Sequence, residues 1–274
     1  MSRRTSSRIL VALGCVAVLV FSLFPVFIML STAVDARAND GSTSLLPTQL
    51  TWDNFAFVLD EGGFTRYLLN SLFVGLATVL LSGLLALLAS VAVSRFVFRF
   101  RTAILVLVLV IQMVPLEAMV IPLFIQAKTL GMLNHLLGLV IVYVAFSLPF
   151  AIWMLRGFVA AVPREVEEAA YVDGASWPRM FWSVLLPLCA PGLVATSVFS
   201  FITAWNEFVF AITFMNDQDS YTVAAGLRQF FTQYGTDWGS VMAGSTLITL
   251  PVMIFFILVQ RRLSAGLVAG AVKG

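Results

Sequence analysis

Residues 156–183 read RGFVAAVPREVEEAAYVDGASWPRMFWS and form a polar connection between two apolar stretches. Pro163 suits the first turn of a helix, because its missing N–H is not needed there. Three glutamates follow Pro163, near the helix end where the dipole favours negative charge. Asp173-Gly174 ends this helix, since glycine tolerates a left-handed exit, and Pro178 begins the next one. The connection therefore predicts a short helix, a tight turn and a second helix that enters the following apolar stretch.

The rest of the chain is too apolar for a soluble protein. Of its 274 residues, 60% are hydrophobic and 11% charged, whereas a soluble domain has roughly 45–50% apolar and about 25% charged residues. One soluble core cannot hide that excess. The net charge of +2 is too small for the basic surface that binds nucleic acid. Composition therefore predicts an integral membrane protein, in contact with the lipid bilayer and without a nucleic-acid partner.

Six apolar stretches are long enough to cross the membrane, since a helix needs about 20 apolar residues to do so. The third and fifth contain prolines, which kink a membrane helix, so neither needs to be one straight rod. The prediction is an all-α integral membrane fold with an N-terminus at 1–8, a single six-helix transmembrane domain at 9–264 and a C-terminal tail at 265–274. The predicted spans are residues 9–31, 68–93, 103–127, 136–155, 184–214 and 241–260.

The first apolar stretch can also be interpreted as a secretory signal, because Arg3 and Arg4 precede it and small residues follow it. Its apolar core, residues 9–29, is longer than the roughly 7–15 residues typical of such signals. An uncleaved membrane helix is therefore favoured.

The basic residues predict the orientation, because Lys and Arg concentrate in cytoplasmic loops. With six spans, both termini lie on one side, and all but four of the 16 Lys and Arg residues fall on that side. Both termini and the connection 156–183 are therefore expected in the cytoplasm. The four exceptions are Arg37, Arg66, Lys128 and Arg228.

The short helix expected in residues 156–183 can act as a docking surface. Ala169 and Ala170 carry small side chains that let a partner approach the backbone closely, and the neighbouring acids supply charge at the rim. An amphipathic helix that lies on the membrane surface is the alternative, and the physical properties of these residues leave both open.

The spacing in this region resembles the EAA motif of ABC importer permeases, which reads EAA, three residues, G, nine residues, I, one residue and LP. The matching residues are Glu168-Ala169-Ala170, Gly174 and Leu186-Pro187, while Val184 stands where the family has isoleucine. The resemblance implies a type I ABC importer permease with a MetI-like core, in which this segment is a cytoplasmic coupling helix that inserts into an ATPase subunit. The residues expected to couple to the ATPase are Glu167, Glu168, Ala169, Ala170, Asp173, Gly174 and Pro187.

Two further stretches resemble carbohydrate importer permeases of the MalG-like, binding-protein-dependent family. They are residues 204–208, AWNEF, and the closing residues 266–274, GLVAGAVKG. In that family the C-terminal tail reaches the interface between the two ATPase subunits, whereas a frayed terminus is the alternative for these residues. The tail residues expected to contact the ATPase are Gly266, Gly270, Lys273 and Gly274.

Two acids lie within the predicted spans, Glu117 and Glu207. An ionised acid at membrane depth costs at least about 2.5 kcal/mol, so each should face protein, water or a partner. They either line the translocation path or tie kinked helices together, and the sequence leaves both open. In the MalG-like family the main membrane sugar site tends to belong to the partner permease, so this chain is assigned none. The candidates for the path are Gln112, Glu117, Trp205, Asn206 and Glu207.

No catalytic residue or metal ligand is expected. The sequence has no G-x-x-x-x-G-K-[ST] phosphate loop, so ATP and Mg²⁺ are expected on partner ATPase subunits and no cofactor in this chain. Cys15 and Cys189 lie in apolar runs, and the single histidine, His135, lacks partners for a zinc site. The chain is expected to be a transport subunit rather than an enzyme.

The resemblance implies a transmembrane subunit of an ATP-driven, solute-binding-protein-dependent sugar importer in a prokaryotic cell membrane, which couples ATP hydrolysis to alternating access. The expected partners are a second, non-identical permease subunit, two cytoplasmic ABC ATPase subunits and an extracytoplasmic solute-binding protein. Importers of glycerol phosphate, amino acids or peptides share the EAA loop and are alternatives. A stand-alone secondary transporter or channel is a further alternative, although it has no need of the long connection at 156–183. A membrane-embedded enzyme is disfavoured, because no nucleophile–base pair is recognisable.

Overall fold

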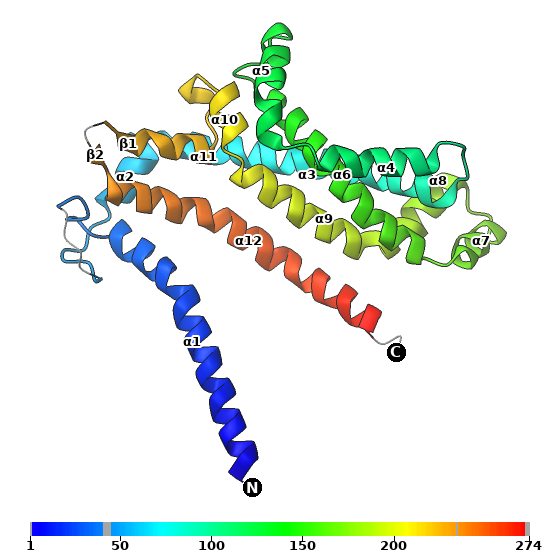
Figure 1. Cartoon of the computed structure of the whole chain (residues 1–274), viewed down its shortest axis with the longest axis horizontal. Helices are drawn as coiled ribbons and strands as arrows, with labels where there is room; N and C mark the ends of the chain where they lie inside the picture. Colours follow the sequence, from blue (N-terminus) through cyan, green and yellow to red (C-terminus); the bar gives the residue numbers. More distant parts are fainter. Residues whose placement is uncertain (1, 41–44, 234, 272–274) are drawn as a thin grey trace. The chain divides into compact units, whose positions relative to one another are not determined.

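The computed structural model describes residues 2–40, 45–233 and 235–271, with side chains described only within residues 8–260. The described chain is mostly helical (Figure 1). Its elements form two compact units: unit 1 comprises Met1–Thr65 and Gly226–Pro251, and unit 2 comprises Arg66–Ala225 and Val252–Gly274. Two long helices, α3 (Phe64–Arg95) and α12 (Trp238–Ala271), contribute to both units.

Unit 1 contains the first long helix, α1, whose apolar window has a mean hydropathy of 2.8 and none of its residues buried. A surface of this kind is stable only against lipid or another apolar partner. Within the unit, the ring of Phe230 packs 6.2 Å from that of Phe64 and 6.4 Å from that of Phe57, measured between centroids. The further elements of unit 1 are α1 (Ser2–Ala33), α2 (Asp53–Asp60), η4 (Leu227–Phe230) and the antiparallel pair β1 (Phe231–Thr232) and β2 (Gly235–Thr236).

Asp35 organises the loop that follows α1. It is 5% exposed and accepts hydrogen bonds from the N–H of Arg37 at 3.1 Å, the hydroxyl of Thr48 at 3.0 Å and the N–H of Gln49 at 3.3 Å. Burial by itself raises the pKa of Asp35, but these hydrogen bonds outweigh it and hold the pKa below its usual value.

Asp237 plays the same role at the start of α12. Its carboxylate accepts hydrogen bonds from the N–H of Ser240 at 3.1 Å, the hydroxyl of Ser240 at 2.6 Å and the side-chain amide of Asn39 at 2.9 Å. This is the pattern of a helix N-cap. Burial raises the pKa of Asp237, whereas the bonds from Ser240 and Asn39 lower it by more, so the pKa is lowered overall.

Acid is expected to loosen these loops. Because both aspartates have folded-state pKa values below the unfolded value, their stabilising effect is complete above the unfolded pKa of about 3.9 and is lost as the pH falls through the folded value. The amide protons of Arg37 and Gln49 should therefore lose protection only below about pH 4, in exchange measured by mass spectrometry and corrected for intrinsic rates. Asp35→Asn should abolish that pH dependence at these two amides. Loss of protection on raising the pH instead would contradict the assignment.

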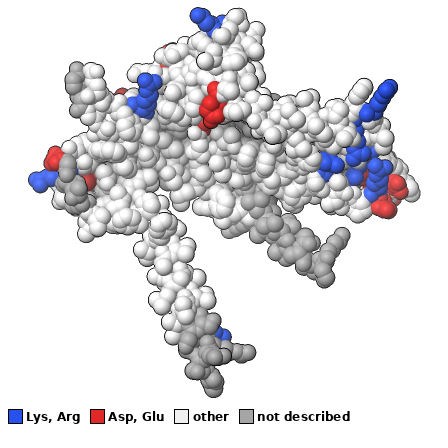
Figure 2. Space-filling model, viewed as in Figure 1, with Lys and Arg blue, Asp and Glu red and all other residues white. Residues whose placement is uncertain are grey.

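Unit 2 is a helical layer in which α6 (Leu136–Ala161) packs most extensively against α9 (Leu186–Asn206). Two apolar clusters form its core: one surrounds Tyr143 and Phe210, and the other surrounds Leu155 and Phe181. Charged side chains gather at the end where α7 and α8 lie, and they are more widely scattered over the rest of the face in view (Figure 2). The other elements are α4 (Arg101–Gln112), η1 (Leu116–Met119), α5 (Val120–Thr129), α7 (Arg164–Val172), α8 (Trp177–Met180), η2 (Phe181–Leu185), α10 (Val209–Phe214), η3 (Gln218–Ser220) and α11 (Val223–Gly226).

The apolar stretches predicted from the sequence are helices. Within the described residues, five helices are long and apolar enough to cross a membrane, and a bent pair brings the number to six if it is counted as one span. The five are Arg8–Ala33, Phe64–Arg95, Leu136–Ala161, Trp177–Asn206 and Trp238–Gln260.

The third predicted span is broken rather than straight. Helices α4 and α5 meet at an angle of 92° across the segment that contains Pro115. Pro115 has an extended ψ of 129°, and a proline also disfavours the helical conformation of the residue before it. The interpretation of 103–127 as a kinked stretch is confirmed.

The fifth predicted span, 184–214, begins and ends differently from the prediction. Its helix already starts at Trp177 and ends at Asn206, because Glu207 is extended with a ψ of 124°, and α10 then forms a separate helix. Near its start, the N–H of Leu186 bonds to the carbonyl of Phe181 in a π-helical turn, η2. Pro187 follows that turn, and its missing N–H explains why the regular ladder is interrupted there.

Candidate functional site

Helix α7 and the turn after it form as residues 156–183 predicted. The helix begins after Pro163, whose ψ of 140° is extended, and ends at Val172. The N–H of Gly174 bonds to the carbonyl of Tyr171 at 3.0 Å, and the N–H of Ala175 bonds to that of Ala170 at 2.9 Å. These two bonds are those of a Schellman motif, which needs a left-handed residue at its C′ position. Gly174 has a φ of 81° and supplies it.

The outer face of this helix and turn is open. Val172 is 87% exposed, and a Cβ built on Gly174 would meet no atom within 4 Å. The face is small, shallow and rimmed by carboxylates, so a partner with a cleft can approach its backbone. The exposed candidates in this region are Glu168, Ala169, Asp173 and Gly174, while Ala170 is half-buried.

Glu167 differs from the exposed coupling candidates, because it points into the protein. Its side chain is 12% exposed, and its Oε1 accepts a hydrogen bond from Nε of Arg95 at 2.6 Å. Nη2 of Arg95 also donates to the carbonyl of Val162 at 2.8 Å. The sequence did not identify Arg95, since 72 residues separate the pair and an arginine at the end of a span is ordinary. Glu167 is therefore an internal tie, and the coupling role expected of it stays a prediction. Pro187 is exposed and shapes the start of α9.

Two of the path candidates lie together at the bend between α4 and α5. Gln112 and Glu117 line a cavity of about 470 Å³ with the aromatic rings of Phe146, Phe150 and Phe199. Both polar side chains are exposed. A cavity with aromatic walls and a few polar groups is the usual form of a small-molecule site.

Glu207 occupies a separate position and acts as a cap. Its Oε2 accepts a hydrogen bond from the hydroxyl of Tyr143 at 2.6 Å, and its two carboxylate oxygens accept bonds from the N–H of Phe210 at 3.0 and 3.1 Å. A further bond at 3.2 Å comes from the N–H of Ala211. The carboxylate therefore satisfies the free N–H groups at the start of α10. Of the two interpretations of Glu207, the geometry favours the one in which it ties helices together.

Trp205 and Asn206 do not join the cavity at the bend. Trp205 is 2% exposed and stacks on Phe201 at 5.3 Å between centroids, so it belongs to the core and differs from the expectation of a residue that lines an open path. Asn206 is exposed, and its amide donates to the carbonyl of Ile202 on its own helix at 3.0 Å. Of the five path candidates, Gln112 and Glu117 thus share one cavity, and the other three lie outside it.

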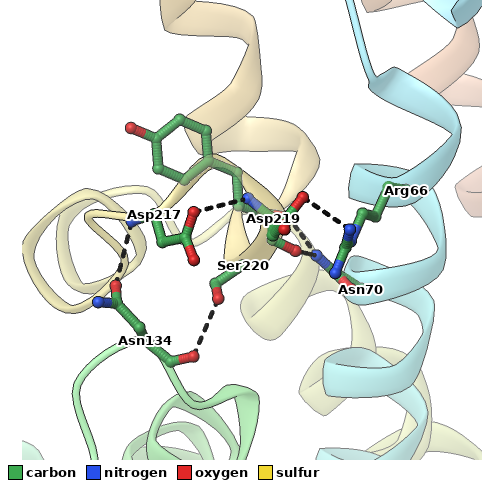
Figure 3. Close-up of polar contacts among 7 residues, drawn as sticks. Arg66, Asn70, Asn134, Asp217, Asp219 and Ser220 are labelled. Carbon is green, nitrogen blue, oxygen red and sulfur yellow. Dashed lines mark hydrogen bonds and ion pairs between the residues drawn. The ribbon is translucent and has the colours of Figure 1, made fainter.

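A polar cluster that sequence reasoning missed lies at the other end of α3, where Arg66 forms an ion pair of 2.6 Å with Asp219 (Figure 3). The amide of Asn70 donates to the carbonyls of Asp219 and Tyr221, each at 2.9 Å. Asn134, in a left-handed conformation with a φ of 60°, accepts a bond of 2.9 Å at its carbonyl from the hydroxyl of Ser220. Arg66 and Arg95 are separated by almost the whole of α3, roughly 40 Å at 1.5 Å per residue. The two ends of this helix are therefore held by different polar clusters.

The tail candidates can be placed only in part. Gly266 and Gly270 fall within the helical backbone of α12, outside the residues whose side chains are described, and Lys273 and Gly274 lie outside the described residues. Among the residues that are described, no group of three or more His, Cys, Asp or Glu side chains is placed to hold a metal ion.

Comparison with known proteins places the chain among transport proteins. The profile of the family described as "Binding-protein-dependent transport system inner membrane component" matches residues 82–268, more than half of the chain. The diacetylchitobiose uptake system permease protein DasC of Streptomyces coelicolor is 39% identical over 276 residues, covering 100% of both chains. The trehalose/maltose transport system permease protein MalG of Thermococcus litoralis is 35% identical over 277 residues, again covering 100% of both.

The fold also matches a solved structure. A chain in the crystal structure of a bacterial ABC transporter involved in the import of the acidic polysaccharide alginate superposes with a TM-score of 0.81 at 20% identity, covering 95% of this chain and 98% of that one. This likeness confirms the expected fold class, an all-α integral membrane protein with the architecture of an importer permease.

Proposed function

Because the chain belongs to the family of binding-protein-dependent transport system inner membrane components, we propose that it is a permease subunit of an ATP-driven sugar importer. The observation that carries the sugar class is identity of 35% or more, over the full length, to relatives named for diacetylchitobiose and for trehalose and maltose. Both names refer to disaccharides or their derivatives, so a sugar of that size is the proposed substrate. The EAA resemblance and the family profile agree on the class of protein.

We propose that α7 and its turn receive the movement of an ATPase subunit. The exposed face from Glu168 to Gly174 and the Schellman turn support this, since they present a rigid, small-residue surface to a partner. In the proposal, two ATPase subunits hold ATP and Mg²⁺ and close on nucleotide. Each closure moves a coupling helix and tilts the helices that follow it, which opens the pathway by rigid-body rocking.

We place the sugar pathway at the α4–α5 bend. Support comes from the cavity of about 470 Å³, where Gln112 and Glu117 supply hydrogen-bonding groups beside three aromatic rings. Amide and carboxylate oxygens bond sugar hydroxyls, and aromatic faces stack on sugar rings. Trp205, Asn206 and Glu207 do not line this cavity, and we assign them no contact with the sugar.

The remaining assignments complete the proposed assembly. We propose a second, non-identical permease subunit that spans the membrane beside this chain, and a solute-binding protein on the outer side. We also propose that the tail glycines and Lys273 contact the ATPase pair. Both termini are proposed to be cytoplasmic in a prokaryotic cell, because all but four of the 16 Lys and Arg residues fall in the termini and loops of that side. The unburied apolar face of α1 agrees with a position against lipid or another subunit.

Reconstitution tests the proposed function. We expect sealed proteoliposomes with both permeases, the ATPase and the binding protein to accumulate radiolabelled diacetylchitobiose, trehalose or maltose only when ATP and the binding protein are present. Vesicles that contain this chain alone should show no uptake, with or without an ion gradient. Uptake by the chain alone, driven by such a gradient, would instead establish the secondary transporter.

A further inference from the structure

Helix α7 is attached to its own chain in an unusual way. Of its nine residues, all of them described, Glu167 alone is buried. A helix of this size is normally held by an apolar stripe, but here the buried group is a carboxylate. Its partner Arg95 is equally enclosed, with a side-chain exposure of 11% against 12% for Glu167. The ion pair is therefore the buried attachment of α7, beside the packing of the half-buried Ala170 against the core around Leu155 and Phe181.

Arg95 bridges two elements at once. Its guanidinium donates from Nε to Glu167 in α7 and from Nη2 to the carbonyl of Val162, the C-terminal cap of α6. Between these two acceptors lies the extended link Val162–Pro163, with ψ values of 120° and 140°. Such a link is where α7 can swing relative to α6, and the planar fork of arginine spans it.

The two faces of α7 have separate tasks. Successive residues of an α-helix point about 100° apart, so Glu167 faces Arg95 while Glu168 faces outward. A push on the outer face is thus applied to a helix whose inner face is bonded to the last residue of α3. Since α3 is one continuous helix of 32 residues, a displacement of Arg95 can pass along it as along a rigid element.

We propose that Arg95 and Glu167 are positioning residues that couple α7 to α3, so that displacement of the coupling helix moves the end of α3 with it. This inference rests on the proposed function. Neither residue is assigned a contact with the ATPase or the sugar. Without the pair, α7 is expected to move with the ATPase subunit while α3 moves less. ATP is then hydrolysed with less transport.

The test is the number of sugar molecules imported per ATP hydrolysed, measured in proteoliposomes and normalised to assembled complex. Glu167→Gln keeps the shape of the side chain but removes its charge, and Arg95→Lys keeps the charge but removes the fork. We expect each to lower the ratio roughly fivefold or more, the lower end of typical coupling between sites. Glu165→Gln, the same change at an exposed position of the same helix, should leave the ratio within about twofold of wild type.

A purely structural role would give a different result. The double variant Arg95→Met with Glu167→Met replaces the pair by apolar side chains of similar length, a change that often preserves folding. We expect the double variant to assemble and to import as little sugar per ATP hydrolysed as the single variants do. Amide exchange across α7 should be faster than in wild type. A normal ratio in the double variant, or in both single variants, would overturn the inference. Absence of ATP-dependent uptake by the wild-type assembly would instead reject the proposed function.

Discussion

Gly174→Asp is expected to reduce sugar uptake by the reconstituted transporter to background, while the chain still inserts in the membrane. Gly174 has a φ of 81°, where a side chain costs about 1–2 kcal/mol, and the Schellman bonds at the end of α7 depend on that conformation. The site has free space for a Cβ, so the chain itself has room for the substitution. The loss should arise where the turn meets the ATPase, because a carboxylate and a displaced backbone would lie in the docking surface.

A matched control separates backbone conformation from mere substitution of a glycine. Gly157 is also exposed and also has free space for a Cβ, but it lies within α6 with an ordinary helical φ. Gly157→Ala should leave uptake unchanged and should not lower stability, since alanine favours a helix over glycine by up to about 1 kcal/mol. Gly174→Ala should give an uptake between that of Gly157→Ala and that of Gly174→Asp. Copurification of the ATPase with each variant is the second readout. Normal uptake by Gly174→Asp, with normal copurification, would contradict the coupling role of this turn.

Local chemistry explains why the coupling region could be predicted. Pro163 and Pro178 restrict the backbone through their rings, and Gly174 permits a left-handed conformation because it has no Cβ, so the helix, turn and helix follow from positions close in sequence. The kink near Pro115 could be predicted for the same reason. The angle of 92° could not, because it depends on packing against other helices.

Long-range pairs could not be predicted. Arg95 lies 72 residues from Glu167, and Tyr143 lies 64 residues from Glu207. Each acid carried a clear signal of its own, either as a helix-start glutamate or as a charge at membrane depth, but neither signal names the partner. The sequence therefore identified which side chains needed an explanation, whereas the tertiary structure determined whether each one faces outward or inward.

Glu207→Ala is expected to lower the free energy of unfolding by about 2–3 kcal/mol. The carboxylate accepts bonds from the hydroxyl of Tyr143 and from the N–H groups of Phe210 and Ala211, and hydrogen bonds to charged groups contribute roughly 1.5–3 kcal/mol each in water and less within membranes. Tyr143 is 2% exposed, so its hydroxyl would be left buried without this acceptor. Denaturant titration in detergent micelles measures the change.

Two further variants decide whether Glu207 is a structural cap or a transport group. Glu207→Gln keeps one carbonyl oxygen as acceptor and should lose about 1 kcal/mol, with uptake reduced only in proportion to folded protein. Tyr143→Phe removes a single donor, and a double-mutant cycle with Glu207→Gln should give a coupling energy of about 0.5–1 kcal/mol, as expected for residues in direct contact. If Glu207→Gln unfolds as wild type does yet blocks uptake, the carboxylate takes part in transport itself. The cap interpretation requires the opposite result: Glu207→Gln must lose stability, and its uptake must fall only because less of the protein is folded.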